Sequence, residues 1–372
     1  MPDIKCAVCG KPAKVRTGQV TCGMECGQAY NAQRRAVKET PSAEDTLESK
    51  LALVMKRQRK PLSVVELADK LDCGPSRIQD ALGSMVESGF NVRVAGEGKV
   101  ELTADVEHNA GPNPVHDIRM FQNGFRKFGV TGDNHLCNKH ERLDVLNAAY
   151  DMYEAEGITT VYNTGNWIDG EARFNKLELK VFGMDAQIDY WIDNYPQRKG
   201  VTTYYVAGDD HEGWYQQREC IEIGRYAMLR AQQAGRNDLV YLGYVESDIE
   251  LKAKHGSAVL RVMHPGGGSA YATSYTEQKI VESYQGGEKP DILLLGHYHK
   301  FNHGYPREVW TVQTGTTCDQ TIFMRKKKLQ AHVGFGIVEF NQSERGDINR
   351  FKNEFFAFYD KGFYLNGRKF AA

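Results

Sequence analysis

Hydrophobic and polar positions change their spacing at two points along the chain, near residues 45 and 118. Between these points, apolar residues recur at helical spacing over 47–55 and again over 65–86. We expect a first helix near 47–55, a short second helix near 65–71, and a third that starts at Pro75 and ends at Gly89. Two short apolar stretches then flank a glycine turn at 96–98, which predicts a hairpin.

Beyond residue 118, short β-branched and aromatic runs alternate with longer stretches of helical spacing. The predicted strands lie within 126–135, 157–167, 202–211, 238–243, 257–267 and 290–299. The predicted helices are 140–156, 184–196, 213–234 and 275–286. Strands that alternate with helices predict a layered α/β domain.

The stretch 61–103, two short helices followed by a hairpin, resembles a winged helix-turn-helix domain. Such domains usually place their second helix in the major groove of DNA. The outward face of that helix offers Arg77 and Gln79, but Asp80 and Glu87 lie beside them. A module that contacts protein therefore remains the alternative.

Four of the eight cysteines lie close together near the N-terminus, in the spacing C-x2-C-x12-C-x3-C. Two close pairs about a dozen residues apart can complete a tetrahedral thiolate site for zinc. Such a small unit lacks a hydrophobic core, so we expect the metal to hold it together. The predicted ligands of this structural zinc are Cys6, Cys9, Cys22 and Cys26.

Composition places the chain among ordinary globular proteins, with 41% hydrophobic and 26% charged residues. The net charge of −1 is unevenly spread, because residues 1–60 carry twelve Lys and Arg against six Asp and Glu, a net +6. A basic N-terminal region favours a nucleic-acid partner. No apolar run reaches transmembrane length and the N-terminus has no apolar signal core, so we expect a cytoplasmic protein without a membrane partner.

Polar residues gather directly after the predicted strands, where open α/β sheets bind their ligands. Asp133 and His135 form one i, i+2 pair and His297 and His299 form another, and in an extended chain this spacing puts both side chains on one side. We therefore expect five loops to meet at one site. These loops contain Asp133 to His135, Asn166 to Asp169, Asp209 to Glu212, His264, and His297 to His299.

This order of motifs over 118–340 resembles that of the calcineurin-like metallophosphoesterases, in particular the branch of the DNA repair exonucleases. The resemblance implies an αββα sandwich that holds two divalent metal ions. It implies that His211 contacts the phosphate and protonates the leaving oxygen, and that Glu212 orients His211. It also implies a first metal held by Asp133, His135 and His299, a bridging residue at Asn166, and a second metal held by Asp210, His264 and His297.

Two positions depart from the pattern of that family. Asn166 stands where the family has an aspartate, and an extra aspartate precedes His211, so that Asp209 and Asp210 both become candidate ligands. We favour Asp210, with Asp169 or Asp209 as possible substitutes for the missing carboxylate. A degenerate, inactive site is the alternative.

Nitrogen and oxygen ligands suit Mn²⁺, which we favour, as well as Fe, Co²⁺ or Zn²⁺. A basic run, Arg325, Lys326, Lys327 and Lys328, either contacts a phosphate backbone or forms a solvated loop. The predicted domains are a zinc knuckle over 1–38, a winged helix over 45–104 and a metallophosphoesterase domain over 118–372. The sequence thus predicts a metal-dependent nuclease acting on DNA. The alternatives are an enzyme for small phosphoesters or cyclic nucleotides and a non-catalytic DNA-binding regulator.

Overall fold

The computed structural model describes residues 3–5, 11–14, 26, 46–58, 60–105, 112–268 and 270–358. The chain divides into two compact units, one of Met1–Val86 with Val92–Leu102 and the other of Glu87–Asn91 with Thr103–Ala372. Three of the predicted zinc ligands, Cys6, Cys9 and Cys22, lie outside the described residues. Among the described residues, no helix is long and apolar enough to cross a membrane.

Over residues 46–102, where all but residue 59 are described, the first unit has helices and then a hairpin in the order that the sequence predicts. A capping box begins the second helix, because Ser63 Oγ accepts from the Glu66 N–H at 3.2 Å and the Glu66 carboxylate accepts from the Ser63 N–H at 2.7 Å. Leu51, Leu67 and Ile78 are fully buried. The elements are α2 (Leu47–Arg57), α3 (Val64–Leu71), α4 (Pro75–Glu87), β3 (Val92–Ala95) and β4 (Lys99–Leu102), with the short N-terminal strands β1 (Asp3–Lys5) and β2 (Pro12–Lys14) paired separately.

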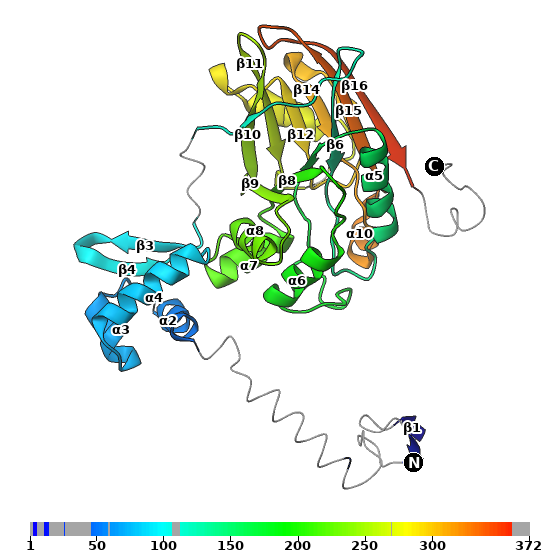
Figure 1. The fold of residues 1–372 in the computed structure, drawn as a ribbon. Coiled ribbons are helices and arrows are strands. Elements are labelled where there is room, and N and C mark those ends of the chain that lie inside the picture. Colours follow the sequence, from blue (N-terminus) through cyan, green and yellow to red (C-terminus); the bar gives the residue numbers. More distant parts are fainter. Residues whose placement is uncertain are drawn as a thin grey trace. The chain divides into compact units, whose positions relative to one another are not determined.

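The second unit is built on two mixed six-stranded sheets (Figure 1). In the first sheet the order is β13 (Asn302–Gly304), β14 (Trp310–Gln313), β12 (Ile292–Leu295), β11 (Ser257–Met263), β10 (Glu246–Lys252) and β5 (Val115–His116). In the second sheet it is β16 (Ile348–Ala357), β15 (Gly334–Gln342), β6 (Arg126–Thr131), β7 (Thr160–Asn163), β8 (Thr202–Ala207) and β9 (Leu239–Tyr244).

Two apolar layers flank the second sheet. One layer packs Phe128, Val130 and Tyr162 of the second sheet against strands β10, β11, β12 and β14 of the first, so the two sheets lie face to face. The other layer packs Val161 and Tyr205, on the opposite face of the second sheet, against helices. These helices are α5 (Leu143–Ala155), α6 (Met184–Asn194) and α8 (Ile223–Gln233).

Helix α9 (Tyr275–Ser283) lies on the outer side of the first sheet, where Val281 packs with Leu293 and Leu295. The domain is therefore an α/β fold with two mixed sheets between helices, consistent with the layered sandwich that the sequence resemblance implies. Short helices at 286–288 and 306–308, together with α7 (His211–Glu219) and α10 (Ile322–Lys327), complete the unit.

One predicted helix differs from the structure, and several strands were not predicted. The single helix expected over 213–234 is two helices, α7 and α8, because Cys220 takes a left-handed backbone with φ of 52° and Ile221 then pairs with Phe90. The strands β5, β10, β13, β14, β15 and β16 were not predicted. Among these, β10 carried a recognisable pattern. Its inward residues Ser247, Ile249 and Leu251 alternate with partly exposed acidic residues, a pattern that fits a strand with one buried face.

Candidate metal centre

Six loops meet at the carboxyl ends of neighbouring strands. The loops after β6 and β7 are joined by their backbones, since Asp133 N–H donates to Gly165 O and His135 N–H to Asn166 O, each at 2.9 Å. The loops after β8, β11 and β12 supply the other predicted residues, as the sequence indicates. The loop after β14 joins them, although it is not among the five loops that the sequence predicts.

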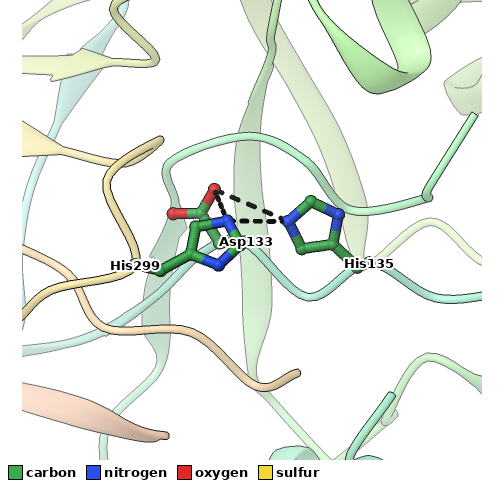
Figure 2. Close-up of side chains that lie close together, drawn as sticks. All are labelled: Asp133, His135 and His299. Carbon is green, nitrogen blue, oxygen red and sulfur yellow. Dashed lines mark hydrogen bonds and ion pairs between the residues drawn. The ribbon is translucent and has the colours of Figure 1, made fainter. Parts of the chain in front are cut away.

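The first cluster consists of Asp133, His135 and His299, whose side chains point toward one another (Figure 2). The Nε2 atoms of His135 and His299 lie 3.0 Å apart. Asp133 Oδ1 lies 3.5 Å from Nε2 of His299 and 3.9 Å from Nε2 of His135. Asp133 and His135 are almost fully buried, and the side chain of His299 is 12% exposed.

The second cluster consists of Asp210, His264 and His297. The two carboxylate oxygens of Asp210 divide between the histidines, with Oδ1 3.3 Å from His264 Nε2 and Oδ2 3.2 Å from His297 Nδ1. His264 Nδ1 lies 2.7 Å from the carbonyl oxygen of Thr164 and His297 Nε2 lies 2.7 Å from that of Gly267. In the neutral rings, these carbonyls hold the proton on the nitrogen that faces away from Asp210, which leaves the lone pair on the nitrogen that faces it.

Asn166 lies between the two clusters, in the position that the sequence analysis predicts for a bridging residue. One polar atom of its amide lies 3.4 Å from Asp133 Oδ1, and the other lies 2.9 Å from Asp210 Oδ1. Its backbone N–H donates to Glu212 Oε1 at 2.9 Å, and Gly208 N–H donates to the same oxygen at 2.8 Å. The buried Glu212 carboxylate therefore holds the backbones of two site loops, and burial raises its pKa to about 8.

The donor set fits divalent cations. Two imidazole nitrogens that face each other at 3.0 Å beside a carboxylate give three lone-pair donors converging on one point, which a cation satisfies and a single proton does not. Burial, with the charges of nearby histidines, lowers the pKa of His135 to about 4 against the opposing effect of Asp169, and a neutral ring is the form that binds metal. The described ligands of both clusters are nitrogen and oxygen atoms without a thiolate, which suits Mn²⁺, Fe, Co²⁺ or Zn²⁺.

Asp169 holds His135 and His211 together. Its Oδ1 lies 2.9 Å from His135 Nδ1 and 3.2 Å from His211 Nδ1, and its carbonyl oxygen lies 2.8 Å from the same His211 nitrogen. Asn138 and Asn175 donate to its other carboxylate oxygen at 2.8 and 3.0 Å. The sequence analysis assigned to Glu212 the task of orienting His211, and this was wrong. Glu212 bonds to the backbone of neighbouring loops, and Asp169 is the carboxylate beside His211.

The electrostatic surroundings of His211 favour its charged form. Burial alone would lower the pKa of His211, but the charge of Asp210 and the hydrogen bond to Asp169 raise it to about 10. Asp169 in turn has its pKa held well below the usual range, because these contacts with histidine outweigh its burial. Asp169 therefore remains an anion that can accept from both rings.

Most of the site residues have a left-handed backbone. The φ angles are 48° at Asp133 and His135, 51° at Asn166, 78° at His297 and 56° at His299. Residues other than glycine rarely adopt this conformation, and it is concentrated at functional sites. The expectation that each i, i+2 pair lies on one side of an extended chain was therefore wrong. Tight loops, rather than strand alternation, bring these side chains together, and His297 and His299 point into different clusters.

Three glycines surround the ring of His264. A Cβ atom would lie 2.6 Å from this ring at Gly165, 2.6 Å at Gly208 and 2.9 Å at Gly296. Each glycine directly follows or closely follows a strand and precedes a site residue. The space for a buried imidazole thus depends on three loops at once.

Residues that the sequence analysis missed fix these loops. Thr316 Oγ1 donates to the carbonyl oxygen of Asp133 at 2.6 Å, and Asn134 Nδ2 donates to Thr317 Oγ1 at 2.9 Å. Asn163 Nδ2 donates to Asn134 Oδ1 at 2.6 Å. The signal that could have revealed Thr316 is Gly315-Thr316-Thr317 one residue after β14, a glycine followed by polar residues as in the other site loops.

The remaining predicted residues lie apart from the clusters. Asp209 is exposed and belongs to neither cluster. Arg77 is exposed on α4, and Cys26 is the only predicted zinc ligand among the described residues. Arg325, Lys326 and Lys327 form the last turn of α10, which Lys328 caps, so this run is helical rather than a solvated loop.

No family model and no curated protein matches the chain. Solved structures resemble part of it. An archaeal phosphodiesterase is 11% identical, with a TM-score of 0.36 over 62% of this chain and 99% of that one. Vps29 from Entamoeba histolytica in complex with Zn²⁺ is 15% identical, with a TM-score of 0.28 over 62% and 98%. A 5'-nucleotidase precursor from Thermus thermophilus is 11% identical, with a TM-score of 0.32 over 63% and 54%. Likenesses this distant do not assign a function to the chain.

Proposed function

We propose that the chain is a metal-dependent phosphodiesterase that cleaves nucleic acid, with DNA as its substrate. The observation that carries this proposal is the pair of His and Asp clusters on either side of Asn166, with His211 held beside them by Asp169. Two adjacent cation sites and a positioned proton donor are the groups that hydrolysis of a phosphodiester needs.

Asp133, His135 and His299 would hold one ion, and Asp210, His264 and His297 the other. When bound, such ions polarise a phosphoryl oxygen and lower the pKa of water, which supplies the nucleophile. The amide of Asn166 lies between the clusters and contributes an oxygen without charge. The negative charge that a carboxylate at position 166 would supply therefore comes from Asp210 instead.

His211 is the proposed proton donor to the leaving oxygen. Its Nδ1 faces the carbonyl and carboxylate oxygens of Asp169, so that nitrogen carries a fixed proton. Nε2 is then the atom that gives up a proton as the ester bond breaks. Asp169 keeps the ring in this orientation, as a positioning residue.

Basic and aromatic residues beside the site support a nucleic-acid substrate. Phe174 contacts the ring of His211, with centroids 5.6 Å apart, and packs at a tilt against Phe323 of α10, with centroids 4.9 Å apart. The same short helix carries the run from Arg325 to Lys328, which would contact the phosphate backbone. The winged helix with its exposed Arg77 and the N-terminal zinc knuckle would add further DNA contacts.

The test compares substrates on the full chain with Mn²⁺. Single-stranded DNA, double-stranded DNA and RNA are incubated beside bis-p-nitrophenyl phosphate and p-nitrophenyl phosphate. We expect cleavage of DNA and of the diester dye, loss of both with a chelator, and loss of both in His299→Gln. His255→Gln, which changes an exposed histidine away from the clusters, should retain activity. Preference for the monoester, or cleavage of the dye without DNA, would favour a small-phosphoester enzyme. DNA binding without turnover would favour a regulator.

A further inference from the structure

A cavity of about 810 Å³ lies in the second unit at the carboxyl end of β14. Its walls come from the segment after His299, the loop after β14, helix α10 and the end of β16. Its lining includes Phe301, Phe355, His332, Arg325, Gln330 and Asp319. A cavity of this size with a few polar groups on aromatic walls is typical of a small-molecule site.

The wall of this cavity is joined directly to the first cluster. His332 N–H donates to the carbonyl oxygen of His299 at 2.8 Å, and Thr316 N–H donates to the carbonyl oxygen of His332 at 3.0 Å. Thr316 also donates to the Asp133 carbonyl through its hydroxyl group. His332 therefore connects the wall of the cavity to the backbones of two residues of the first cluster.

The cavity offers a flat apolar surface. The rings of Phe301 and Phe355 are stacked with centroids 4.2 Å apart and planes 15° apart, and both are half-buried. The ring of Phe355 packs over Gly315 and Gly334, where a Cβ atom would approach it to 2.8 Å. The two glycines therefore make room for a ring close to the loop after β14.

Polar groups on the same walls are mainly donors. His332 Nδ1 accepts from Phe301 N–H at 3.0 Å, so the neutral ring carries its proton on Nε2. Arg325 is exposed and makes no ion pair among the described residues. The acid on the wall, Asp319, is already paired with the buried Arg142 at 2.9 Å. The Nε2–H of His332 and the guanidinium of Arg325 therefore suit a ligand with acceptor atoms and negative charge.

We propose that this cavity binds the nucleoside attached to the scissile phosphate, with its base against the Phe301–Phe355 pair and its acceptor atoms or adjoining phosphate at Arg325. This inference rests on the proposed function, since it places the reacting phosphate at the clusters. Stacking on aromatic rings accepts every base, so the cavity selects nucleotides over simple alkyl esters without reading sequence.

The test uses two diesters that share one leaving group, p-nitrophenyl thymidine 5'-phosphate and methyl p-nitrophenyl phosphate. We expect wild type to favour the thymidine ester in kcat/KM. Arg325→Gln and Phe355→Leu should each reduce the ratio of the two values by about tenfold, the loss typical of one stacking or charged contact. Arg350→Gln and Phe182→Leu, which change an exposed arginine and an exposed phenylalanine outside the cavity, should keep the wild-type ratio.

Equal kcat/KM for the two esters in wild type, or an unchanged ratio in Arg325→Gln, would overturn the nucleoside site and leave the phosphodiesterase intact. Arg325 is exposed, so this variant serves even where Phe355→Leu fails to fold. Hydrolysis of neither ester would overturn the proposed function instead. In that case calorimetric titration with thymidine 5'-monophosphate decides on the cavity. About tenfold weaker binding by Arg325→Gln supports it, and equal binding refutes it.

Discussion

The carboxylate of Asp133, in the first cluster, accepts a hydrogen bond from the backbone N–H of His297, in the second cluster, at 2.8 Å. Oδ1 of Asp133 therefore faces the histidines of its own cluster. Oδ2 fixes the loop that carries His297 of the second cluster. The burial of Asp133 would raise its pKa, but nearby histidines lower it to about 2, so it remains an anion for both tasks.

This shared role predicts that Asp133 and His299 differ in their effect on metal content. Asp133→Asn should lose most of both ions, because the amide is a poor ligand and its nitrogen cannot accept from His297. His299→Gln should lose mainly one ion, because it leaves the second cluster unchanged. Equilibrium dialysis against Mn²⁺ followed by elemental analysis measures the difference, with His255→Gln as the control. Identical losses in the two variants would show that the clusters are not linked through Asp133.

Asn166 and Asp210 provide a test of charge balance. Asn166→Asp should keep or tighten metal binding, whereas Asp210→Asn should weaken the second site, since Asp210 is the only carboxylate of that cluster. The double variant should recover more activity than Asp210→Asn alone, because one carboxylate then replaces the other. The measurement is rate against Mn²⁺ concentration for all four chains. Additive losses would mean that the two residues do not share one charge balance, and would favour a decaying site.

Asp169→Asn should reduce turnover by about 10- to 100-fold, the usual effect of removing a carboxylate behind a ligand histidine. The loss should be larger for a diester with a poor leaving group than for a p-nitrophenyl ester, because only the former needs the proton from His211. The pH profile should also lose its basic limb. Glu171→Gln, in the same loop, is the matched control. Equal losses for both leaving groups would limit Asp169 to holding His135.

The sequence indicated the site more fully than it indicated the geometry of the site. Residues such as His264 and His299 were identifiable because a histidine directly after an apolar strand adds little to core packing and is well placed to bind a ligand. The left-handed backbone of Asp133 and the end of helix α7 at Cys220 could not be identified from the sequence. Such conformations depend on tertiary contacts that override local preference. For the same reason the sequence indicated Glu212, and not Asp169, as the carboxylate that orients His211. Asp169 lies in the loop after β7 and Glu212 in the first turn of α7, and only the tertiary path of the chain decides which of these buried acids reaches the ring.

The N-terminal cysteines should bind one zinc ion independently of the clusters. Cys6→Ser or Cys22→Ser in the full chain should lower the zinc content by about one ion, the stoichiometry of a four-thiolate site. Hydrolysis of a diester dye should change little, whereas DNA affinity or folding should suffer. Cys73→Ser, in the turn between α3 and α4, is the control. Unchanged zinc content would rule out the knuckle.

His116 should make the stability of the second unit depend on pH. Burial lowers the pKa of His116 below its ordinary 6.5, and its Nδ1 lies 2.8 Å from the hydroxyl of Tyr162. The unfolded chain therefore binds more protons below pH 6.5, so the free energy of unfolding falls as pH falls through that range and is unaffected by this group above it. Urea midpoints of wild type and His116→Gln should converge on acidification. A constant difference across this range would contradict the shift.

His135 and His299 are 164 positions apart in the chain, yet their ring nitrogens lie 3.0 Å apart. In the unfolded chain, bringing two such residues together costs roughly 4 to 5 kcal/mol of loop-closure entropy. In the folded protein, the packing of the strands and cores offsets this entropy cost without a bound ion. An ion shared by the two rings therefore has almost no affinity for the unfolded chain, and thermodynamic linkage makes it a ligand of the native state alone. The free energy of unfolding then rises with the free ion concentration, by about 2.7 kcal/mol at one hundred times the dissociation constant. The concentration of free ion around the protein would thereby set the stability of its fold.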